Sequence, residues 1–364
     1  MKLTVTQENL NKALGVVARV AGSKTSLPIL NNILLKTDNN RLLLAATNLE
    51  VAITEHIGAK VASEGAITVP SRLMSEFIAN LPKSHVDLKL DGTKLHISSG
   101  HYTSTINGLP ADDFPALPDI HEALELEISA QLMKRAIAQT VLTASRDDTR
   151  PVLTGVLCHS FEGNLYFAAT DGYRLAERKL VALQEDVSAL IPASTLQDVV
   201  RVLPEGTETI TMLIDSTQVR FRMDDIEITS RLIEGNFPDY RQLIPKSTEI
   251  VAATNRDELT RITKIASLFA RENGGSITIQ TDGSKKTISI HSIASQLGEN
   301  TSETDAEVGQ DGTVTLNSRY LIEALGCLDN QEVSFGFSGK LAPCVLKSQD
   351  KNPDYQHIIM PLKS

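Results

Sequence analysis

The sequence has few of the residue types that usually bind cofactors, cross membranes or lock secreted folds. It contains no tryptophan, only 4% aromatic residues and three cysteines in 364 residues. Cys158, Cys327 and Cys344 are widely separated and have no metal-ligand spacing, which favours buried free thiols in a reducing cytoplasm. No apolar run approaches the ~20 residues that a membrane span needs, and residues 1–5 alternate like a strand rather than a signal peptide. We therefore expect a cytoplasmic protein that has no contact with a membrane.

A recognisable reaction centre is also missing. Paired aspartates occur at positions 112–113, 147–148 and 224–225, but adjacent residues on a strand point to opposite faces and make poor acid/base pairs. The eight histidines include no H-E-x-x-H or H-x-H pair, and no G-x-S-x-G motif marks a nucleophile. We expect no catalysis, no metal site and no cofactor. The enzyme alternative is a metal-dependent nuclease or phosphoesterase built on clustered aspartates, which metal-dependent turnover would reveal.

An internal repeat is the strongest positive signal. Pro28 recurs as Pro151 and Pro115 as Pro238, each 123 residues later, within similar surrounding sequence. A third, fainter copy places residues 315–322 where the second copy has its Pro-Ala-Ser segment. The repeat predicts three similar domains, over residues 1–122, 123–246 and 247–364.

Each copy carries the same pattern of secondary structure. Thr6, Ser129 and Asn255 each stand where a capping residue precedes helically spaced apolar residues. A second helix is predicted after the shared landmark of each copy, over residues 71–81, 193–203 and 318–328. The remaining segments alternate like strands and are separated by turn signals. The fold class is therefore predicted as α+β, with two helices on an antiparallel sheet in each copy.

Positive charge is concentrated on the first predicted helix of each copy. The formal net charge is −10, which argues against nucleic-acid binding by bulk charge. Residues 6–24, 129–146 and 255–271 nevertheless carry charges of +2, +3 and +2. A single basic helix face is usually only a solvated face, but three equivalent ones favour a shared surface for a polyanion. Without aromatic stacking motifs, such a surface would contact phosphates independently of sequence.

Four segments together resemble one known family. Residues 27–30, 169–176, 235–241 and 358–362 are similar to the bacterial DNA polymerase III beta subunit family, the replicative sliding clamps, and the resemblance covers essentially the whole chain. It implies a DNA sliding clamp, a processivity factor without catalysis, in which three clamp domains per chain close into a head-to-tail dimeric ring. Helices would line the hole and sheets would form the outer wall.

The resemblance also implies positions for the contacts of such a clamp. The positions that would face duplex DNA, together with the basic helix residues, are Lys12, Arg19, Lys24, Arg72, Lys134, Arg135, Arg146, Arg261 and Lys264. The dimer interface would include Thr105, Ile106 and Leu268. A peptide-binding pocket would include Leu153, Thr170, Gly172, Tyr173, Arg174, Leu175, Pro238, Leu243, Asn317, Tyr320, Cys344, Val345, Ile358, Met360, Pro361 and Leu362.

The implied partners are duplex DNA, a second copy of the chain, and proteins that carry short linear peptides. The latter are the DNA polymerase III alpha subunit, the clamp loader, other polymerases and repair proteins. Three positions depart from the family: Tyr173 replaces a common His, Gln242 replaces a common Arg, and the chain ends in Lys363 and Ser364. From the residues alone, Leu153, Leu175, Leu243 and Ile358 are more simply interpreted as core residues. A β-rich interaction scaffold unrelated to DNA is a third alternative.

Overall fold

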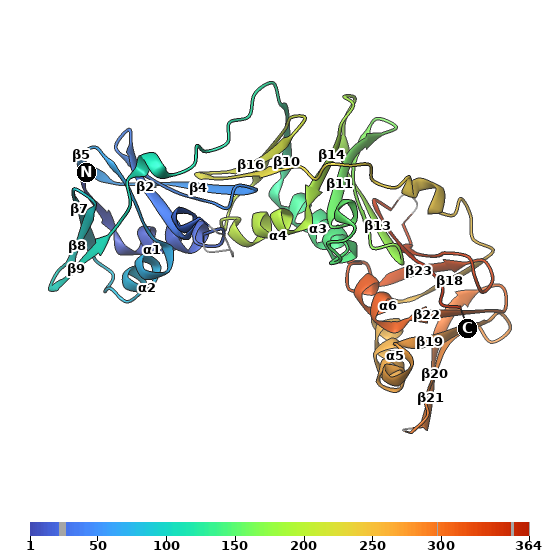
Figure 1. Ribbon diagram of the computed structural model, residues 1–364. Helices are drawn as coiled ribbons and strands as arrows, with labels where there is room; N and C mark the ends of the chain where they lie inside the picture. The colour runs from blue at the N-terminus through green and yellow to red at the C-terminus, as the bar shows by residue number, and fades with distance from the viewer. Residues whose placement is uncertain (22–26, 297, 351–352, 364) are drawn as a thin grey trace. The chain divides into compact units, whose positions relative to one another are not determined.

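The computed structural model describes residues 1–21, 27–296, 298–350 and 353–363 (Figure 1). Its backbone packs into two compact units. The first comprises Met1–Gln131 and Ser194–Leu232, and the second comprises Leu132–Ala193 and Ile233–Ser364. The middle third of the chain is thus divided between the two units.

The first unit contains two antiparallel sheets. The order in its five-stranded sheet is β5 (Lys60–Ser63), β1 (Lys2–Thr6), β7 (His85–Asp91), β8 (Lys94–Ser99) and β9 (Tyr102–Asn107). The order in its eight-stranded sheet is β10 (Leu124–Ser129), β15 (Thr209–Ile214), β16 (Gln218–Met223), β17 (Ile226–Arg231), β4 (Val51–Gly58), β3 (Arg41–Thr47), β2 (Asn32–Asp38) and β6 (Ala66–Pro70).

Three helices belong wholly or mainly to this unit: α1 (Gln7–Val17), α2 (Ser71–Ala79) and α4 (Ala193–Val202). Helix α1 begins where the sequence predicts, because the Thr6 hydroxyl accepts a hydrogen bond from the Asn9 amide at 3.4 Å. Its buried side chains include Leu10, Leu14 and Val17, which lie on one face. This face packs against β3 and β4, and α1 also lies beside α2 (Figure 1).

The second unit is built on one twelve-stranded sheet. Its order is β14 (Ser188–Pro192), β11 (Gly155–Phe161), β12 (Asn164–Thr170), β13 (Arg174–Ala182), β25 (Tyr355–Ile359), β24 (Cys344–Ser348), β23 (Glu332–Phe337), β18 (Ile250–Asn255), β21 (Gly298–Val308), β20 (Thr287–Ala294), β19 (Ser276–Asp282) and β22 (Gly312–Asn317). Its helices are α3 (Ala130–Thr140), α5 (Arg256–Phe269) and α6 (Ser318–Leu325).

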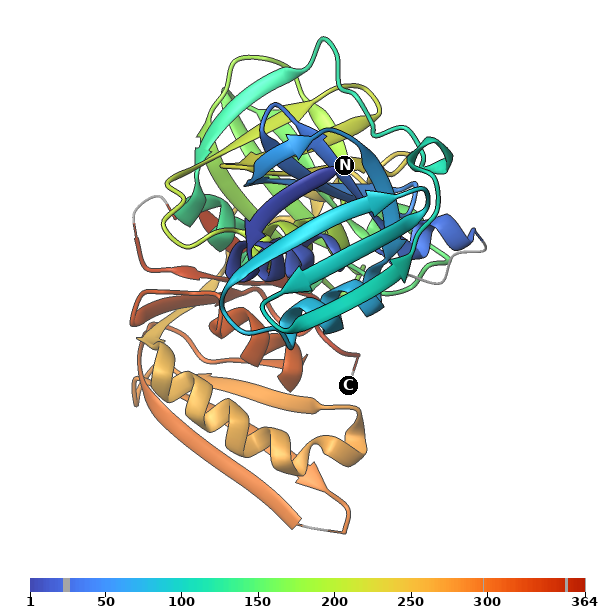
Figure 2. The same cartoon turned by 90° about the vertical axis from the view of Figure 1, so that its left-hand side faces the viewer.

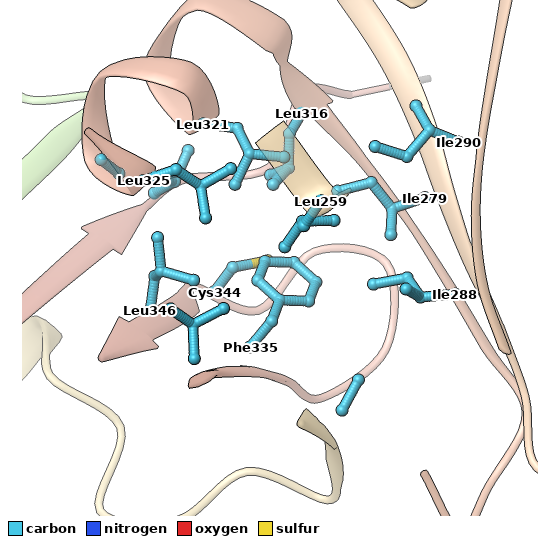
Figure 3. Close-up of a cluster of buried hydrophobic side chains, with 14 of the residues drawn as sticks. Leu259, Ile279, Ile288, Ile290, Leu316, Leu321, Leu325, Phe335, Cys344 and Leu346 are labelled. Carbon is cyan, nitrogen blue, oxygen red and sulfur yellow. The ribbon is translucent and has the colours of Figure 1, made fainter. Parts of the chain in front are cut away.

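Helix α5 shows how local sequence and packing combine in this unit. The Asn255 side chain accepts hydrogen bonds from the amides of Asp257 and Glu258, whose charges also suit the helix N-terminus. The helix lies along β20 and β21 and packs on α6 (Figure 2). Its buried face joins a core that includes Phe335, Leu321 and Cys344 (Figure 3). This core holds the C-terminal strands that shape the site described below.

The predicted elements and the structure agree on where the helices begin. Helices α2, α4 and α6 start at Ser71, Ala193 and Ser318 as expected, but they end earlier than the apolar spacing suggested. The hydrogen-bonded sheets run across the boundaries of the repeat, because β4 pairs with β17 and β13 pairs with β25. Packing units therefore differ from sequence repeats, and the three domain limits stay a prediction. Among the described residues, no helix is long and apolar enough to span a membrane.

The core around Leu321 generates a stability prediction. Leu321 is fully buried, so Leu321→Ala should lower the free energy of unfolding by about 2–5 kcal/mol through lost transfer energy and a residual cavity. Leu341→Ala deletes the same atoms from a side chain that is 68% exposed. This control should change the free energy of unfolding by less than about 0.5 kcal/mol. Urea titration followed by circular dichroism, with hydrogen exchange of α6, measures both. Equal midpoints for the two variants would contradict this description of the core.

Candidate functional site

Three neighbouring strands of the second unit contribute a buried row of apolar side chains. Leu175 on β13 lies opposite Ile358 on β25, and Ile358 lies opposite Val345 on β24. Side chains directly across an antiparallel pair share a face, so the three form one row. They cluster with Ala168 and Tyr240, and each is at most 7% exposed. This row is the floor of the predicted pocket, and the segments around it supply its rim.

The turn between β12 and β13 forms one side of that rim. Gly172 has φ +91°, a conformation that side chains with a Cβ rarely adopt. The Thr170 hydroxyl accepts from the Gly172 amide at 3.0 Å and donates to the Arg174 carbonyl at 2.6 Å. This turn leaves Tyr173 61% exposed, while its carbonyl accepts from the Met360 amide at 2.8 Å. The turn therefore ties the C-terminal segment to the rim.

Arg174 is held rigidly beside the floor. Its guanidinium is 7% exposed, donates to Asp171 at 3.0 Å and to the Leu142 carbonyl at 2.7 Å, and pairs with Glu323. It also stacks on the Tyr320 ring at 4.4 Å from the centroid. Burial opposes ionisation of Glu323, yet hydrogen bonds from arginines lower its pKa. The carboxylate is thus kept charged, and Arg174 is fixed before any ligand arrives.

The remaining pocket positions come from three separate segments. Pro238 and Leu243 are exposed on the connection that follows β17, and Leu243 ends the short helix η5 (Tyr240–Leu243). The C-terminal residues follow β25, and the Leu362 amide donates to the Thr315 carbonyl at 2.8 Å. Asn317 caps α6 by accepting from the Arg319 amide at 2.9 Å. These three segments, far apart in sequence, all belong to the second unit.

Two predicted pocket residues have side chains that point into the protein. Cys344 is 1% exposed and lies among Phe335 and Leu346 in the core, on the opposite side of β24 from Val345 (Figure 3). Burial raises the pKa of its thiol to about 12, so the sulfur is an inert apolar group. Leu153 is also mostly buried, at 7% exposure, at the end of the short helix η4 (Pro151–Leu153).

The basic residues predicted to face DNA lie on the surface wherever the structure describes them. Lys12 on α1, Lys134 on α3 and Lys264 on α5 are exposed, as are Arg19 and Arg146. The other three arginines are also exposed, but each is paired with an acid: Arg72 with Glu76, Arg135 with Asp329 and Arg261 with Glu258. Lys24 lies outside the described residues. Exposed cations on helices of both units provide charge that could meet phosphates.

The predicted interface residues lie at different depths. Thr105 is exposed on β9, the last strand of the five-stranded sheet, and binds the His96 ring at 2.9 Å. Ile106 is only 2% exposed and belongs to the core of the first unit, since successive strand residues face opposite sides. Leu268 is 51% exposed near the end of α5. Ile106 could therefore contribute only its backbone to a partner.

Sequence reasoning did not assign roles to the residues that hold the site together. Asp171 and Glu323 fix Arg174, and the buried tyrosines Tyr240 and Tyr355 each bind a histidine ring, at 2.7 Å and 2.8 Å. Both tyrosines directly follow the Pro-Asp landmark of the repeat. Their equivalent positions in two copies are the sequence signal that could have marked them. Within the described parts of the chain, no cluster of His, Cys, Asp or Glu could hold a metal ion.

His357 beside the floor generates a pH prediction. Its ring is fully buried, and burial together with the charge of Arg174 lowers its pKa to about 3. An unfolded chain protonates it near 6.5, so its contribution to stability is complete above pH 6.5 and is lost as the pH falls toward 3. The expected loss is at most about 1.4 kcal/mol per pH unit.

Urea unfolding at several pH values between 7.5 and 4.5 tests this dependence. The variant His357→Gln should show a shallower loss of stability than the wild type. His101→Gln, at an exposed position, should follow the wild-type slope. Parallel curves for the wild type and His357→Gln would show that His357 titrates normally in the folded protein.

Known proteins are similar to this chain along its whole length. Models of the DNA polymerase III beta subunit match the chain in order: the N-terminal domain at residues 1–118, the central domain at 127–239 and the C-terminal domain at 241–363. The chain is 30% identical over 377 aligned positions to the beta sliding clamps of Staphylococcus epidermidis and Staphylococcus aureus, and each alignment covers both chains completely.

Solved structures agree with the sequence comparison. The DNA polymerase sliding clamp from Bacillus subtilis is 27% identical with a TM-score of 0.95, covering 100% of this chain and 99% of that one. A sliding clamp from Pseudomonas aeruginosa bound to griselimycin is 26% identical with a TM-score of 0.94, and both chains are covered completely. Since family models and relatives match from end to end, the chain belongs to the DNA polymerase III beta subunit family, the non-catalytic sliding clamps of DNA replication.

Proposed function

We propose that two copies of this chain close head to tail into a ring that encircles duplex DNA and tethers replication proteins to it. The observation that carries the proposal is the match of three successive clamp-domain models along the whole repeat. Three domains per chain, at the predicted limits 1–122, 123–246 and 247–364, would give six similar units in a dimer. A closed ring holds DNA by topology, so its direct contacts can stay weak and sliding can stay fast.

Two open sheet edges support closure of the ring. Strand β9 pairs only with β8 among the described strands, and over residues 298–305 strand β21 pairs only with β20. Unpaired edges offer backbone donors and acceptors to another chain. Leu268 and Ile293 are each 51% exposed on elements beside β21, and such side chains would be buried by a partner chain at this edge. We propose that β9 and its Thr105 meet this edge in the partner chain.

The charge distribution supports passage of DNA through the ring. The exposed cations Lys12, Arg19, Lys134, Arg146 and Lys264 lie on or directly after helices of an otherwise acidic chain. Together with Lys24 and the arginines Arg72, Arg135 and Arg261, they would contact phosphates without reading bases. The ion pairs of the three arginines weaken the attraction, which suits a ring that must slide.

The apolar floor and its rim support a site for short linear peptides. Leu175, Val345 and Ile358 would receive Leu and Phe side chains, and the exposed Tyr173, Pro238 and Leu243 would flank them. The partners would be the polymerase III alpha subunit, the clamp loader, and other polymerases and repair proteins in the cytoplasm. Griselimycin, bound by the Pseudomonas clamp, is a candidate ligand of this chain as well.

Topological tethering makes a direct prediction. The protein is loaded by a clamp loader onto a nicked circular plasmid, which is then isolated by gel filtration. It should co-elute with the circle and leave once the plasmid is linearised, because only a closed DNA retains a ring. Blocking both DNA ends with bound protein should restore retention. Stable retention on linear DNA with free ends would contradict the topological mechanism.

Ring closure predicts the assembly state. Light scattering should report twice the mass of one chain at micromolar concentration. Leu268→Asp places a charge at the proposed interface and should shift the protein toward the monomer. Leu341→Asp, the same change at a side chain 68% exposed elsewhere in the unit, is the matched control and should stay dimeric. A monomeric wild type, or a dimeric Leu268→Asp, would count against this interface.

A further inference from the structure

The connection between β17 and β18 crosses the same sheet face that carries the pocket floor. It follows Arg231, and at Gly235 φ is +124° and a Cβ would come within 2.7 Å of the Val152 side chain. Farther along, Phe237, Tyr240 and Ile244 pack onto the floor cluster of Leu175, Val345 and Ile358. Pro238 and Leu243 of this connection remain exposed. The connection therefore lies on the floor, and Pro238 and Leu243 are its exposed apolar side chains.

Tyr240 fixes the middle of the connection through its hydroxyl. The residue is 2% exposed, and its hydroxyl donates to the Glu177 carboxylate at 2.5 Å and lies 2.7 Å from the His159 ring nitrogen Nε2. Burial and the neighbouring Glu177 charge raise the pKa of Tyr240, so the hydroxyl keeps its proton. A protonated donor beside a buried carboxylate makes a strong, directional contact.

Arg241 fixes the connection a second time. Its guanidinium lies 3.6 Å from the Phe161 ring centroid and 4.7 Å from that of Tyr166, and its Nη2 is 3.0 Å from Glu177. Glu177 is itself 5% exposed, and its other oxygen accepts from Gln356 at 2.8 Å. One buried carboxylate thus accepts hydrogen bonds from Tyr240 and Gln356 and forms an ion pair with Arg241.

The anchor and the floor share the same two strands. Glu177 is two residues after Leu175 on β13, and Gln356 is two residues before Ile358 on β25, so both pairs face the same side. Leu175 pairs with Ile358, and Glu177 pairs with Gln356. The Glu177 carboxylate therefore lies two residues along β13 from Leu175 of the floor, on the same face. The connection that binds this carboxylate is thereby held beside the floor.

We propose that Glu177, Tyr240 and Arg241 form a latch that positions Pro238 and Leu243 as one wall of the peptide site. The proposal rests on the peptide-binding function proposed above. None of the three need touch the peptide: they are positioning residues that order the wall before binding. A released connection would have to be ordered at the moment of binding, which weakens affinity. The latch should therefore affect peptide binding separately from the stability of the fold.

The test uses the full-length protein and a fluorescein-labelled peptide with a Leu and a Phe at its C-terminal end. Fluorescence anisotropy gives the dissociation constant, and thermal unfolding gives stability. Arg241→Met should raise the dissociation constant about tenfold and also lower the midpoint, because Glu177 is left buried without a cation. The double variant Glu177→Gln/Arg241→Met removes that charge, so its midpoint should recover while its dissociation constant stays raised.

Two further variants complete the experiment. Tyr240→Phe removes only the hydroxyl and should also weaken binding, which keeps the test available if Arg241→Met does not fold. Arg222→Met breaks a similar pair, with Glu227 at 3.0 Å in the first unit, and should leave peptide affinity unchanged. Griselimycin displacement provides a second ligand for each variant.

The outcomes distinguish failure of the proposed latch from failure of the proposed peptide site. Recovery of affinity together with stability in the double variant would overturn the latch, since binding would then follow the fold alone. Unchanged affinity in the folded latch variants, or an equal loss in Arg222→Met, would overturn it as well. A wild-type protein that binds neither ligand would refute the peptide site itself, together with the latch built on it.

Discussion

Backbone hydrogen bonding between strands of different repeats is the interaction on which the rest of this structure depends. In the first unit β17 pairs with β4 over five residue pairs, and in the second unit β13 pairs with β25 over five. Each pairing makes one sheet from strands that the repeat assigns to different copies. Because every inner strand is hydrogen-bonded on both sides, the copies are joined by the same cooperative bonds that form each sheet.

The pairing of β13 with β25 also aligns the floor of the proposed peptide site. Leu175 comes from the second copy and Ile358 from the third, and only their register brings them side by side with Val345. The same register aligns Glu177 with Gln356, which supplies the carboxylate that Tyr240 and Arg241 use. The proposed peptide site and the proposed latch beside it thus depend on the same set of backbone hydrogen bonds. Divergence between copies then decides which side chains occupy the shared face.

The cations and the apolar residues of the basic helices lie on different faces. The net charge is −10, yet the described cations of the basic helices lie on exposed faces while their apolar residues fill the cores. Several of these cations already have acidic neighbours, so the attraction for a polyanion is moderate. Such a distribution fits a protein held on DNA by closure rather than by affinity. It is also compatible with an interior that lets the duplex slide.

Short-range signals in the chain predict the helix starts. The caps at Thr6 and Asn255 and the starts of α2, α4 and α6 follow from a few neighbouring residues, whose hydrogen bonds and apolar spacing act over one or two turns. Family resemblance added the pocket positions, of which Leu175, Val345 and Ile358 lie side by side in one buried cluster. It could not tell that Cys344 packs into the core around Phe335 while Val345, on the other side of β24, packs with Leu175 and Ile358.

The sequence by itself determined the threefold repeat, the α+β class and the basic helices, because each is encoded by residues close together or at a constant spacing. Tertiary structure alone decided that sheets cross the repeat boundaries, that Ile106 is buried, and that Glu177 anchors Tyr240 and Arg241. The pairings across the repeat boundaries depend on register between strands more than a hundred residues apart, and Tyr240 meets Glu177 across 63 residues. A shift by one residue would exchange the two faces of every strand, so only the folded chain specifies them.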